Sequence, residues 1–499
     1  MAVVGNRTAG QGSCAAVGER GAFLTIARAA APLYVTMLAS SAGSLVDTAL
    51  LGRHATVSLA AFAVTIAVFG PATATVAGAL RGVMPFVAPH RDDPEGLLPL
   101  VRAGMWLAFA VGGVCAAAVA AVPLLGGAFG VPDGILGQLG PFPWMSAGSV
   151  LLIAVNSSAS SVLVALGRSA QVMRSGLVGT AVSVTLSVLL VGGPGPLPSF
   201  GLTGAGLAML ASSLVAAGLN QYALRRRTVL AGRPIRPGRP DPRQVLRLAR
   251  VGLPLGATVL VKFSVLGVLT FAAARIGTGS AAVHGVAESL VNVVFTAAVA
   301  VGQATVPLIA GYAEERDLAR TRRAVDAGFA VALSAVLVLG ATLVVLRGPV
   351  IDRFTRSPDL ADQVVHLLPL VLAVVVGDAL QAVAGFGLVG LRRTVPSLVS
   401  TAVWFGVLAA LAVPIADATG LRGLWTAPAC ANLLQAGTKV RLLQAAQRPR
   451  RGRVRPGARP GPDGGLNLDR SGRTTPRCDV TRRAHYVRRD DGHAGRGTA

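Results

Sequence analysis

The stretch Pro32–Arg53, PLYVTMLASSAGSLVDTALLGR, indicates the fold class of the whole chain. It has the length and apolar character of a membrane-spanning helix, which needs about 20 apolar residues. Its one acidic residue, Asp47, lies three residues from the end of an expected span at 26–50. A carboxylate at membrane depth is costly and is usually kept for function. The stretch therefore predicts a membrane protein with a functional acid in its first span.

The composition of the 499-residue chain agrees with this interpretation. Hydrophobic residues make up 53% of the chain and charged residues only 14%, whereas a soluble domain carries roughly 25% charged residues. A soluble enzyme of this length is therefore excluded. The chain contains no GxxxxGK[ST] phosphate-binding loop, which argues against an ATP-driven pump. Its four cysteines show no CxxC or paired spacing, so a zinc module is not expected.

Apolar stretches separated by breaks rich in Gly, Pro and Arg predict an all-α integral membrane protein with twelve transmembrane helices. The expected spans are 26–50, 57–80, 98–122, 144–166, 171–192, 202–224, 247–273, 281–309, 325–346, 364–389, 396–415 and 422–445. The longest polar interruption, 225–250, contains nine arginines and separates two groups of six spans.

Five segments follow from this division. The expected segments are a cytoplasmic N-terminal segment at 1–24, an N-terminal lobe at 25–224, a basic cytoplasmic linker at 225–246, a C-terminal lobe at 247–446 and a tail at 447–499. After Gln447 the tail has 14 Arg against 5 Asp, with frequent Pro and Gly, which predicts a disordered tail near anionic lipid headgroups. Arginine is concentrated in the connections after every second span, which predicts that both termini are cytoplasmic.

The two halves also repeat each other. A shift of 222 residues without a gap aligns identical residues, among them Pro32 with Pro254, Thr36 with Thr258, Arg53 with Arg275, and Pro85 with Pro307. Six spans per half is an even number, so both halves insert in the same orientation. We therefore expect a parallel repeat, with its axis along the membrane normal, as in transporters that work by alternating access.

The motifs in these halves resemble one known family. They are Pro32 followed by Val46-Asp47-Thr48-Ala49 and Gly52-Arg53 in the first half, and Gly252-Leu253-Pro254 and Asp378-Ala379-Leu380-Gln381 in the second. In these motifs the chain resembles the multidrug and toxic compound extrusion (MATE) family over residues 25–445, with the strongest likeness to its prokaryotic DinF-like branch. The resemblance implies an antiporter with two six-helix lobes around a central cavity. Such an antiporter expels organic, often cationic, compounds in exchange for H⁺ or Na⁺.

The resemblance assigns roles to two residues of the 26–50 span. Asp47 takes the role of the coupling-ion site of the N-terminal lobe, and Pro32 that of the residue at which the helix bends on protonation. The alternative for Asp47 is an acid at the membrane interface that hydrogen-bonds the helix end. Ser183 and Ser187 stand where relatives often carry asparagine, which is expected to weaken the polar network around Asp47.

The C-terminal lobe has two charges near the middle of its spans. Asp378 in the 364–389 span is too short to reach the interface, so it needs a partner or a water-filled cavity, and we predict a coupling role for it. Lys262 in the 247–273 span stands where sodium-coupled relatives carry Glu. We expect it to pair with Asp378 or Glu288, as a salt bridge or a titratable relay, which favours H⁺ over Na⁺ as the coupling ion. The alternative is a lysine that snorkels to the interface.

The remaining polar candidates are less specific. Glu288 and Asn292 lie one turn apart on one helix face, where Glu288 would contact a cationic substrate, pair with Lys262 or be an interfacial acid. His284 is a candidate proton relay, although a structural histidine is favoured. Asn156 and Gln303 would line a cavity or hydrogen-bond between helices.

Two functions other than export are alternatives for a membrane protein of this kind. A lipid-linked precursor flippase of a related two-lobe fold would need uncompensated arginines in its cavity, but the arginines lie mainly in connections. An intramembrane enzyme is not expected, since no DxxxD pair lies within a span. We therefore expect a multi-pass exporter in the bacterial plasma membrane, with no cofactor or metal. Its partners would be a small-molecule substrate and membrane lipid, without nucleic acid, and it would act as a monomer.

Overall fold

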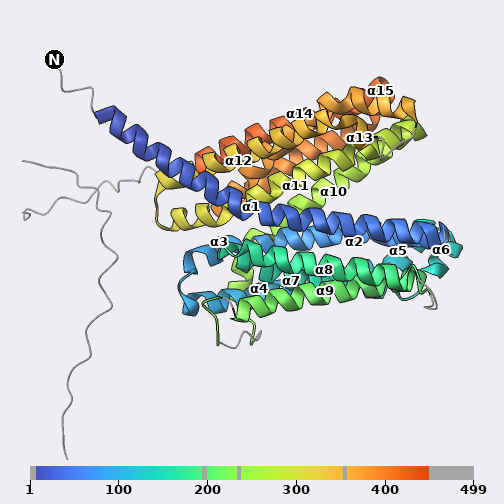
Figure 1. Ribbon diagram of the computed structural model, residues 1–499, viewed down its shortest axis with the longest axis horizontal. Helices are drawn as coiled ribbons and strands as arrows, with labels where there is room; N and C mark the ends of the chain where they lie inside the picture. The colour runs from blue at the N-terminus through green and yellow to red at the C-terminus, as the bar shows by residue number, and fades with distance from the viewer. Residues whose placement is uncertain are drawn as a thin grey trace, which may run out of the picture. The chain divides into compact units, whose positions relative to one another are not determined.

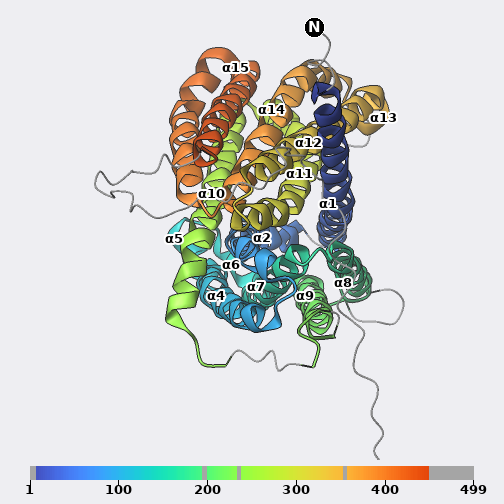
Figure 2. The ribbon, with the colours of Figure 1, turned by 90° about the vertical axis from the view of Figure 1, so that its left-hand side faces the viewer.

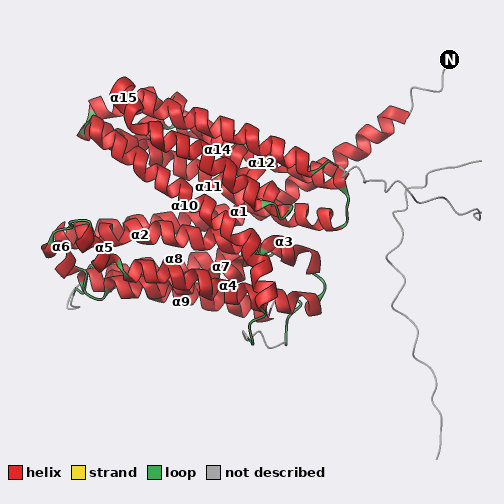
Figure 3. Cartoon of the chain, turned by 180° about the vertical axis from the view of Figure 1, so that it is seen from behind, coloured by secondary structure: helices red, strands yellow, loops and turns green. Residues whose placement is uncertain are grey.

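The structure, a computed structural model, describes residues 7–54, 56–193, 199–226, 228–232, 238–351 and 357–448. All regular elements of these residues are helices (Figure 3). Eleven of these helices are long and apolar enough to cross a membrane. The predicted class, an all-α membrane protein, is confirmed. The basic tail falls outside the described residues from Pro449 onward.

The helices form two successive sets in the chain (Figure 1). The first set is α1 (Arg7–His54), α2 (Thr56–Arg81), α3 (Met84–Val87), the 3₁₀ turn η1 (Ala88–His90), α4 (Pro94–Ala120), α5 (Val122–Ala128), α6 (Asp133–Gln138), α7 (Phe142–Ala165), α8 (Ser169–Leu190) and α9 (Gly201–Arg226). The second set is α10 (Pro242–Ile276), α11 (Thr278–Glu314), α12 (Leu318–Val345), α13 (Arg347–Ile351), α14 (Pro358–Gly390) and α15 (Thr394–Ala446).

Helix α15 resolves the difference between eleven helices and twelve predicted spans. It has 53 residues and is interrupted at Gly420, whose φ of 65° and ψ of −156° are not helical. Glycine adopts a positive φ without steric cost. The break separates the spans predicted at 396–415 and 422–445. At the other end of the chain, α1 begins at Arg7, well before the span expected from residue 26, and its apolar part is Gly21–Gly52.

Several acids in the connections are helix caps. The side chain of Asp93 accepts the backbone N–H of Glu95 at the start of α4, and Asp241 accepts those of Arg243 and Gln244 at the start of α10. Asp317 does the same for Arg320 at the start of α12. A side chain that accepts these unpaired N–H groups stabilises a helix start by about 1 kcal/mol.

The packing confirms the predicted repeat. Helix α1 packs on α8 in its own half and crosses to α11 and α12, while α10 packs on α15 and crosses to α2 and α4 (Figure 2). The 222-residue shift converts each of these pairs into the other. The same register holds for side chains. Thr36 Oγ1 donates to Pro32 O at 2.9 Å, and Thr258 Oγ1 donates to Pro254 O at 2.8 Å.

The two halves contact each other where glycines of α2 face glycines of α10. A Cβ atom on Gly82 would lie 2.5 Å from Gly252 Cα, and one on Gly78 would lie 3.3 Å from Gly256 Cα. Each helix thus presents two glycines four residues apart, a spacing that lets membrane helices approach backbone to backbone. We call this contact the glycine crossing. It lies toward the end of the molecule that carries η1, the α9–α10 connection and the α14–α15 turn, which we call the inner end because arginine predicts it to be cytoplasmic.

Candidate functional site

Asp47 is buried between the helices of the first half. It is 6% exposed in α1, and Ser187 Oγ from α8 donates to its Oδ1 at 2.6 Å. Ser187 was expected to weaken this network relative to an asparagine, and it supplies the short hydrogen bond that the structure shows. Among the side chains that the structure describes, no basic group forms an ion pair with Asp47. The carboxylate is therefore held by a neutral partner.

A second polar cluster in the first half centres on Asn220 of α9. Asn220 Nδ2 donates to Asn156 Oδ1 at 2.7 Å and to Ser160 Oγ at 3.0 Å, and Ser175 Oγ donates to Asn220 Oδ1 at 2.6 Å. Asn220 is 1% exposed. Of the two roles predicted for Asn156, the structure shows the hydrogen bond between helices. The cluster joins α7, α8 and α9.

In the second half, Lys262 of α10 pairs with Asp378 of α14. Lys262 Nζ lies 2.9 Å from Asp378 Oδ1 and 3.0 Å from Oδ2, and it sits 3.4 Å from the centre of the Phe295 ring. The side chain of Asp378 is 4% exposed and that of Lys262 is 18% exposed. Asp378 is the partner of Lys262, and the alternative partner, Glu288, is not.

A second lysine belongs to the same cluster, and the sequence analysis missed it. Lys439 of α15 is 2% exposed, and its Nζ donates to Gln381 Oε1 at 2.7 Å and to Gln435 Oε1 at 3.3 Å. Gln381 Nε2 donates in turn to Asp378 Oδ1 at 3.0 Å. A signal was present, since Lys262 and Lys439 are the only two lysines in the chain.

Glu288 lies beside His284 on α11. His284 Nε2 is 3.4 Å from Glu288 Oε2 and 3.4 Å from Thr270 Oγ1, and its ring centre is 5.5 Å from that of Trp425. His284 Nδ1 is buried and has no hydrogen-bond partner in the part of the chain that the structure describes. This packing agrees with the structural role favoured for His284, while its role as a relay stays a prediction.

The remaining candidates lie outside the Asp47 site and the Lys262–Asp378 cluster. Asn292 is exposed on α11, and Gln303 is 6% exposed with its Nε2 unpartnered among the described residues. Helix α1 is helical on both sides of Pro32, so bending there stays a prediction.

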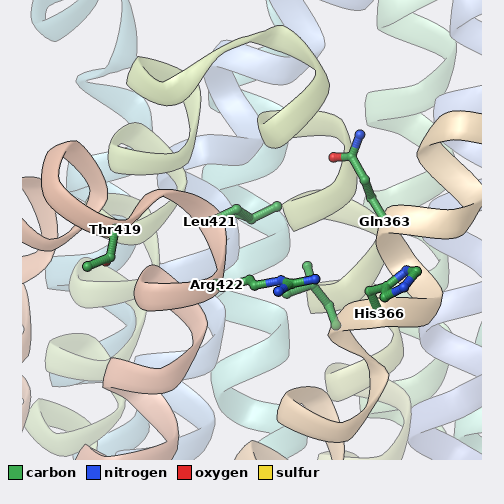
Figure 4. Close-up of a pocket in the computed structure, with 6 residues that line it drawn as sticks. Gln363, His366, Thr419, Leu421 and Arg422 are labelled. Carbon is green, nitrogen blue, oxygen red and sulfur yellow. The ribbon is translucent and has the colours of Figure 1, made fainter.

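The clusters contain no metal-binding group among the described residues, and one pocket lies apart from them. The part of the chain that the structure describes holds no group of three or more His, Cys, Asp or Glu side chains that could bind a metal. A pocket lies where α14 faces the break in α15, at the end opposite the inner end (Figure 4). Its lining consists of Gln363, His366, Leu367, Thr419, Leu421 and Arg422. None of the predicted site residues lines this pocket.

The inner end is held together by an aromatic ring of the first half and two arginines of the second. The guanidinium carbons of Arg392 and Arg247 lie 4.6 Å and 5.2 Å from the centre of the Phe86 ring. Arg392 also donates to Pro85 O, at 3.0 Å from Nη2 and 3.3 Å from Nε, and pairs with Glu314 at 3.1 Å. Burial lowers the pKa of Arg392 and nearby Arg247 lowers it further, while Glu314 opposes both effects. We call this arrangement the inner clamp.

Replacing Phe86 with leucine is expected to loosen the inner clamp. Leucine keeps most of the apolar volume but removes both cation–π contacts, each worth about 0.5–1 kcal/mol at exposed sites. We expect the backbone amides of 84–90 to exchange with deuterium roughly fivefold to thirtyfold faster, which is the range that one to two kcal/mol spans. Phe200→Leu, at a ring that is 51% exposed, is the matched control. Unchanged exchange in Phe86→Leu would show that the two arginines do not hold the segment.

Comparisons with known proteins identify the fold. The family model MatE matches residues 254–415. The chain is similar over its length to proteins named multidrug resistance proteins. It is 26% identical to a probable NorM of Aromatoleum aromaticum over 81% of this chain and 90% of that protein. It is 28% identical to a probable NorM of Deinococcus radiodurans (80% and 90%) and 26% identical to PmpM of Pseudomonas aeruginosa (79% and 86%).

Solved structures give the same result for the fold. The chain superposes on a MATE crystal structure in complex with MaL6 with a TM-score of 0.78 at 20% identity, covering 85% of this chain and 97% of the other. It superposes on an outward-facing MATE family transporter with a TM-score of 0.77 at 19% identity, with the same coverage.

The repeated bundles and the buried charges within them define a polytopic membrane transporter. In sequence and in fold the chain is similar to transporters of the MATE family, whose model matches residues 254–415. Its placement in the DinF-like branch stays a prediction, because the curated relatives named above are NorM and PmpM proteins.

Proposed function

We propose that this protein is a proton-coupled antiporter that exports small organic compounds, cationic or hydrophobic, across the bacterial plasma membrane. The observation that carries the proposal is Asp47, a buried carboxylate whose described partner is the neutral hydroxyl of Ser187. Such an acid becomes neutral when it binds one proton. Because the charged and neutral forms favour different surroundings, proton binding shifts the lobe between two conformations. The names of the relatives, multidrug resistance proteins, support the substrate class.

The second half supports H⁺ rather than Na⁺ as the coupling ion. A hard cation needs several oxygen ligands around it, but both oxygens of Asp378 already accept from Lys262, and Gln381 donates to one of them. A sodium ion at Asp378 would have to displace an ammonium group that lies within hydrogen-bond distance. A proton needs only one basic atom. The Lys262–Asp378 pair also neutralises the lysine that an anionic lipid headgroup would need, so the flippase alternative gains no support from this cluster.

The test is transport in everted membrane vesicles that contain the full chain. We expect a fluorescent organic cation to accumulate when the vesicle interior is acidic, and accumulation to fall at least about tenfold in Asp47→Asn, since asparagine keeps the shape but binds no proton. Asp359→Asn, an exposed acid at the start of α14, is the matched control and should transport like the wild type.

Three outcomes would contradict the proposal. Accumulation driven by a sodium gradient at constant pH would show that the coupling ion is Na⁺. Absence of accumulation under either gradient, with normal amounts of protein in the membrane, would show that organic cations are not substrates. Equal transport by Asp47→Asn and the wild type would place the coupling site elsewhere.

A further inference from the structure

The only two lysines of the chain converge on one carboxylate. Lys262 contacts Asp378 directly, at 2.9 Å and 3.0 Å, while Lys439 reaches it through Gln381, which accepts from Lys439 at 2.7 Å and donates to Asp378 at 3.0 Å. With both lysines protonated, the cluster holds two positive charges and one negative charge. A membrane interior penalises such an excess charge.

The surroundings of Lys439 provide no second counter-ion. Helix α15 packs against α14 and α10, and the charged groups that face Lys439 from these helices are Asp378 and Lys262. On its own helix, Arg441 is exposed. Among the residues that the structure describes, Asp378 is thus the one acid that faces Lys439, and Lys262 already donates to both of its oxygens. Lys439 is 2% exposed, so water compensates little of its charge.

The hydrogen bonds of Lys439 fit the neutral amine. An ammonium group has three N–H donors and a neutral amine has two. The structure gives Lys439 Nζ two acceptors, Gln381 Oε1 at 2.7 Å and Gln435 Oε1 at 3.3 Å. A neutral amine donates one N–H to each of these acceptors, whereas an ammonium group would have a third N–H without a described partner. Lysine can lose its proton when buried, and arginine cannot.

We propose that Lys439 is a second proton-binding site of this transporter, separate from Asp47. The ammonium form gives its proton to water and leaves the neutral amine, and the reverse step takes a proton from water, so no proton passes through Gln381. Lys439 lies seven residues before the end of α15 at Ala446, about 10 Å from the inner end at 1.5 Å per residue. This inference rests on the proposed proton coupling and adds a site to it.

Protonation of Lys439 would act on the Lys262–Asp378 pair. A charge on Lys439 pulls Gln381 and Asp378 toward α15 and competes with Lys262 for the same carboxylate. Lys262 is the lysine whose side chain remains partly exposed, at 18%. Protonation of the buried Lys439 would therefore weaken the pairing of Lys262 with Asp378. The ammonium group of Lys262, at the edge of the cluster, would then present more positive charge to a substrate.

The small number of lysines allows a direct test. Lysine labelled with ¹³C at Cε gives two side-chain signals in the purified full-length protein, and Lys439→Met and Lys262→Met assign them by removing one each. We expect the Lys439 signal to move between about pH 6 and pH 9, as buried lysines can. A Lys439 signal that stays at the ammonium position throughout this range overturns the proposal.

Transport gives a second test. Lys439→Met fixes the neutral state and Lys439→Arg fixes the charged state. In both variants the change of the cation transport rate with pH should be at least about threefold smaller than in the wild type. Arg441→Met is the control and should show the wild-type pH dependence. Retained pH dependence in both Lys439 variants overturns the proposal even where transport is proton-driven. Conversely, a titrating Lys439 signal in a protein without proton-driven transport would overturn the proposed function and leave the proton site standing.

Discussion

Replacement of Asp378 with asparagine is expected to destabilise the protein by about 3–5 kcal/mol, the loss found when one partner of a buried ion pair is removed. The acid is 4% exposed and neutralises Lys262 directly. Asparagine keeps the shape but leaves Lys262 without its counter-ion, and Lys439 loses its nearest acid at the same time. The measurement is the temperature of half-unfolding of the purified protein.

A second substitution separates charge from packing. In the double variant Lys262→Met with Asp378→Asn, the unpaired ammonium group is absent, and we expect most of the lost stability to return. Asp417→Asn removes a pair with Arg275 in which both side chains are more than half exposed, and its effect should stay below about 1 kcal/mol. If Asp378→Asn unfolds at the wild-type temperature, the pair contributes nothing to stability. If the double variant is no more stable than Asp378→Asn, the loss arises from packing.

The Lys262–Asp378 pair was predictable because both residues lie near the middle of apolar spans. Charges at the same depth in neighbouring helices have few partners other than each other. The same reasoning failed for Lys439, which lies near the end of its span, where a lysine is normally interpreted as snorkelling to the interface. Its burial depends on how α14 and α15 pack, and Gln381 and Gln435 become ligands only through that packing.

The interpretation of Glu288 shows a different limit. The sequence left three roles open for it, among them a pair with Lys262, but the structure pairs it with His284, four residues earlier on the same helix. The spacing alone indicates this pair, because residues four apart share a helix face. Local spacing was therefore a better guide here than the search for a partner on another helix.

The fold was predictable further than the site. Hydropathy and the 222-residue repeat predicted the spans and their order, since each span must satisfy its own backbone in the membrane. The two spans predicted at 396–415 and 422–445 are separated at Gly420, as the structure shows. The contact between the halves was not predicted, because it depends on three-dimensional packing, although Gly78, Gly82, Gly252 and Gly256 show a recognisable spacing once the contact is known.

Substitution of Gly82 with alanine is expected to open the inner end. The added Cβ would lie 2.5 Å from Gly252 Cα and 2.7 Å from Gly252 N, both backbone atoms that no side-chain rotation can move. Helices α2 and α10 must therefore separate. Overpacking of this kind costs about 1–3 kcal/mol. Since 1.4 kcal/mol is a factor of ten, the population of the state with a closed inner end should fall roughly fivefold to 140-fold.

The measurement is the distance between spin labels at Asp92 and Arg393, exposed residues at the inner ends of the two halves, with the native cysteines replaced by serine. We expect a longer distance in Gly82→Ala, and cation transport reduced at least about tenfold because the return to the closed state becomes rare. Gly70→Ala in α2 and Gly267→Ala in α10 are matched controls, since nothing lies within 4 Å of their added Cβ atoms. An unchanged distance with normal transport in Gly82→Ala would mean that α2 and α10 accommodate the added methyl group without separating the halves. The inner clamp of Phe86, and not the glycine crossing, would then keep the inner end closed.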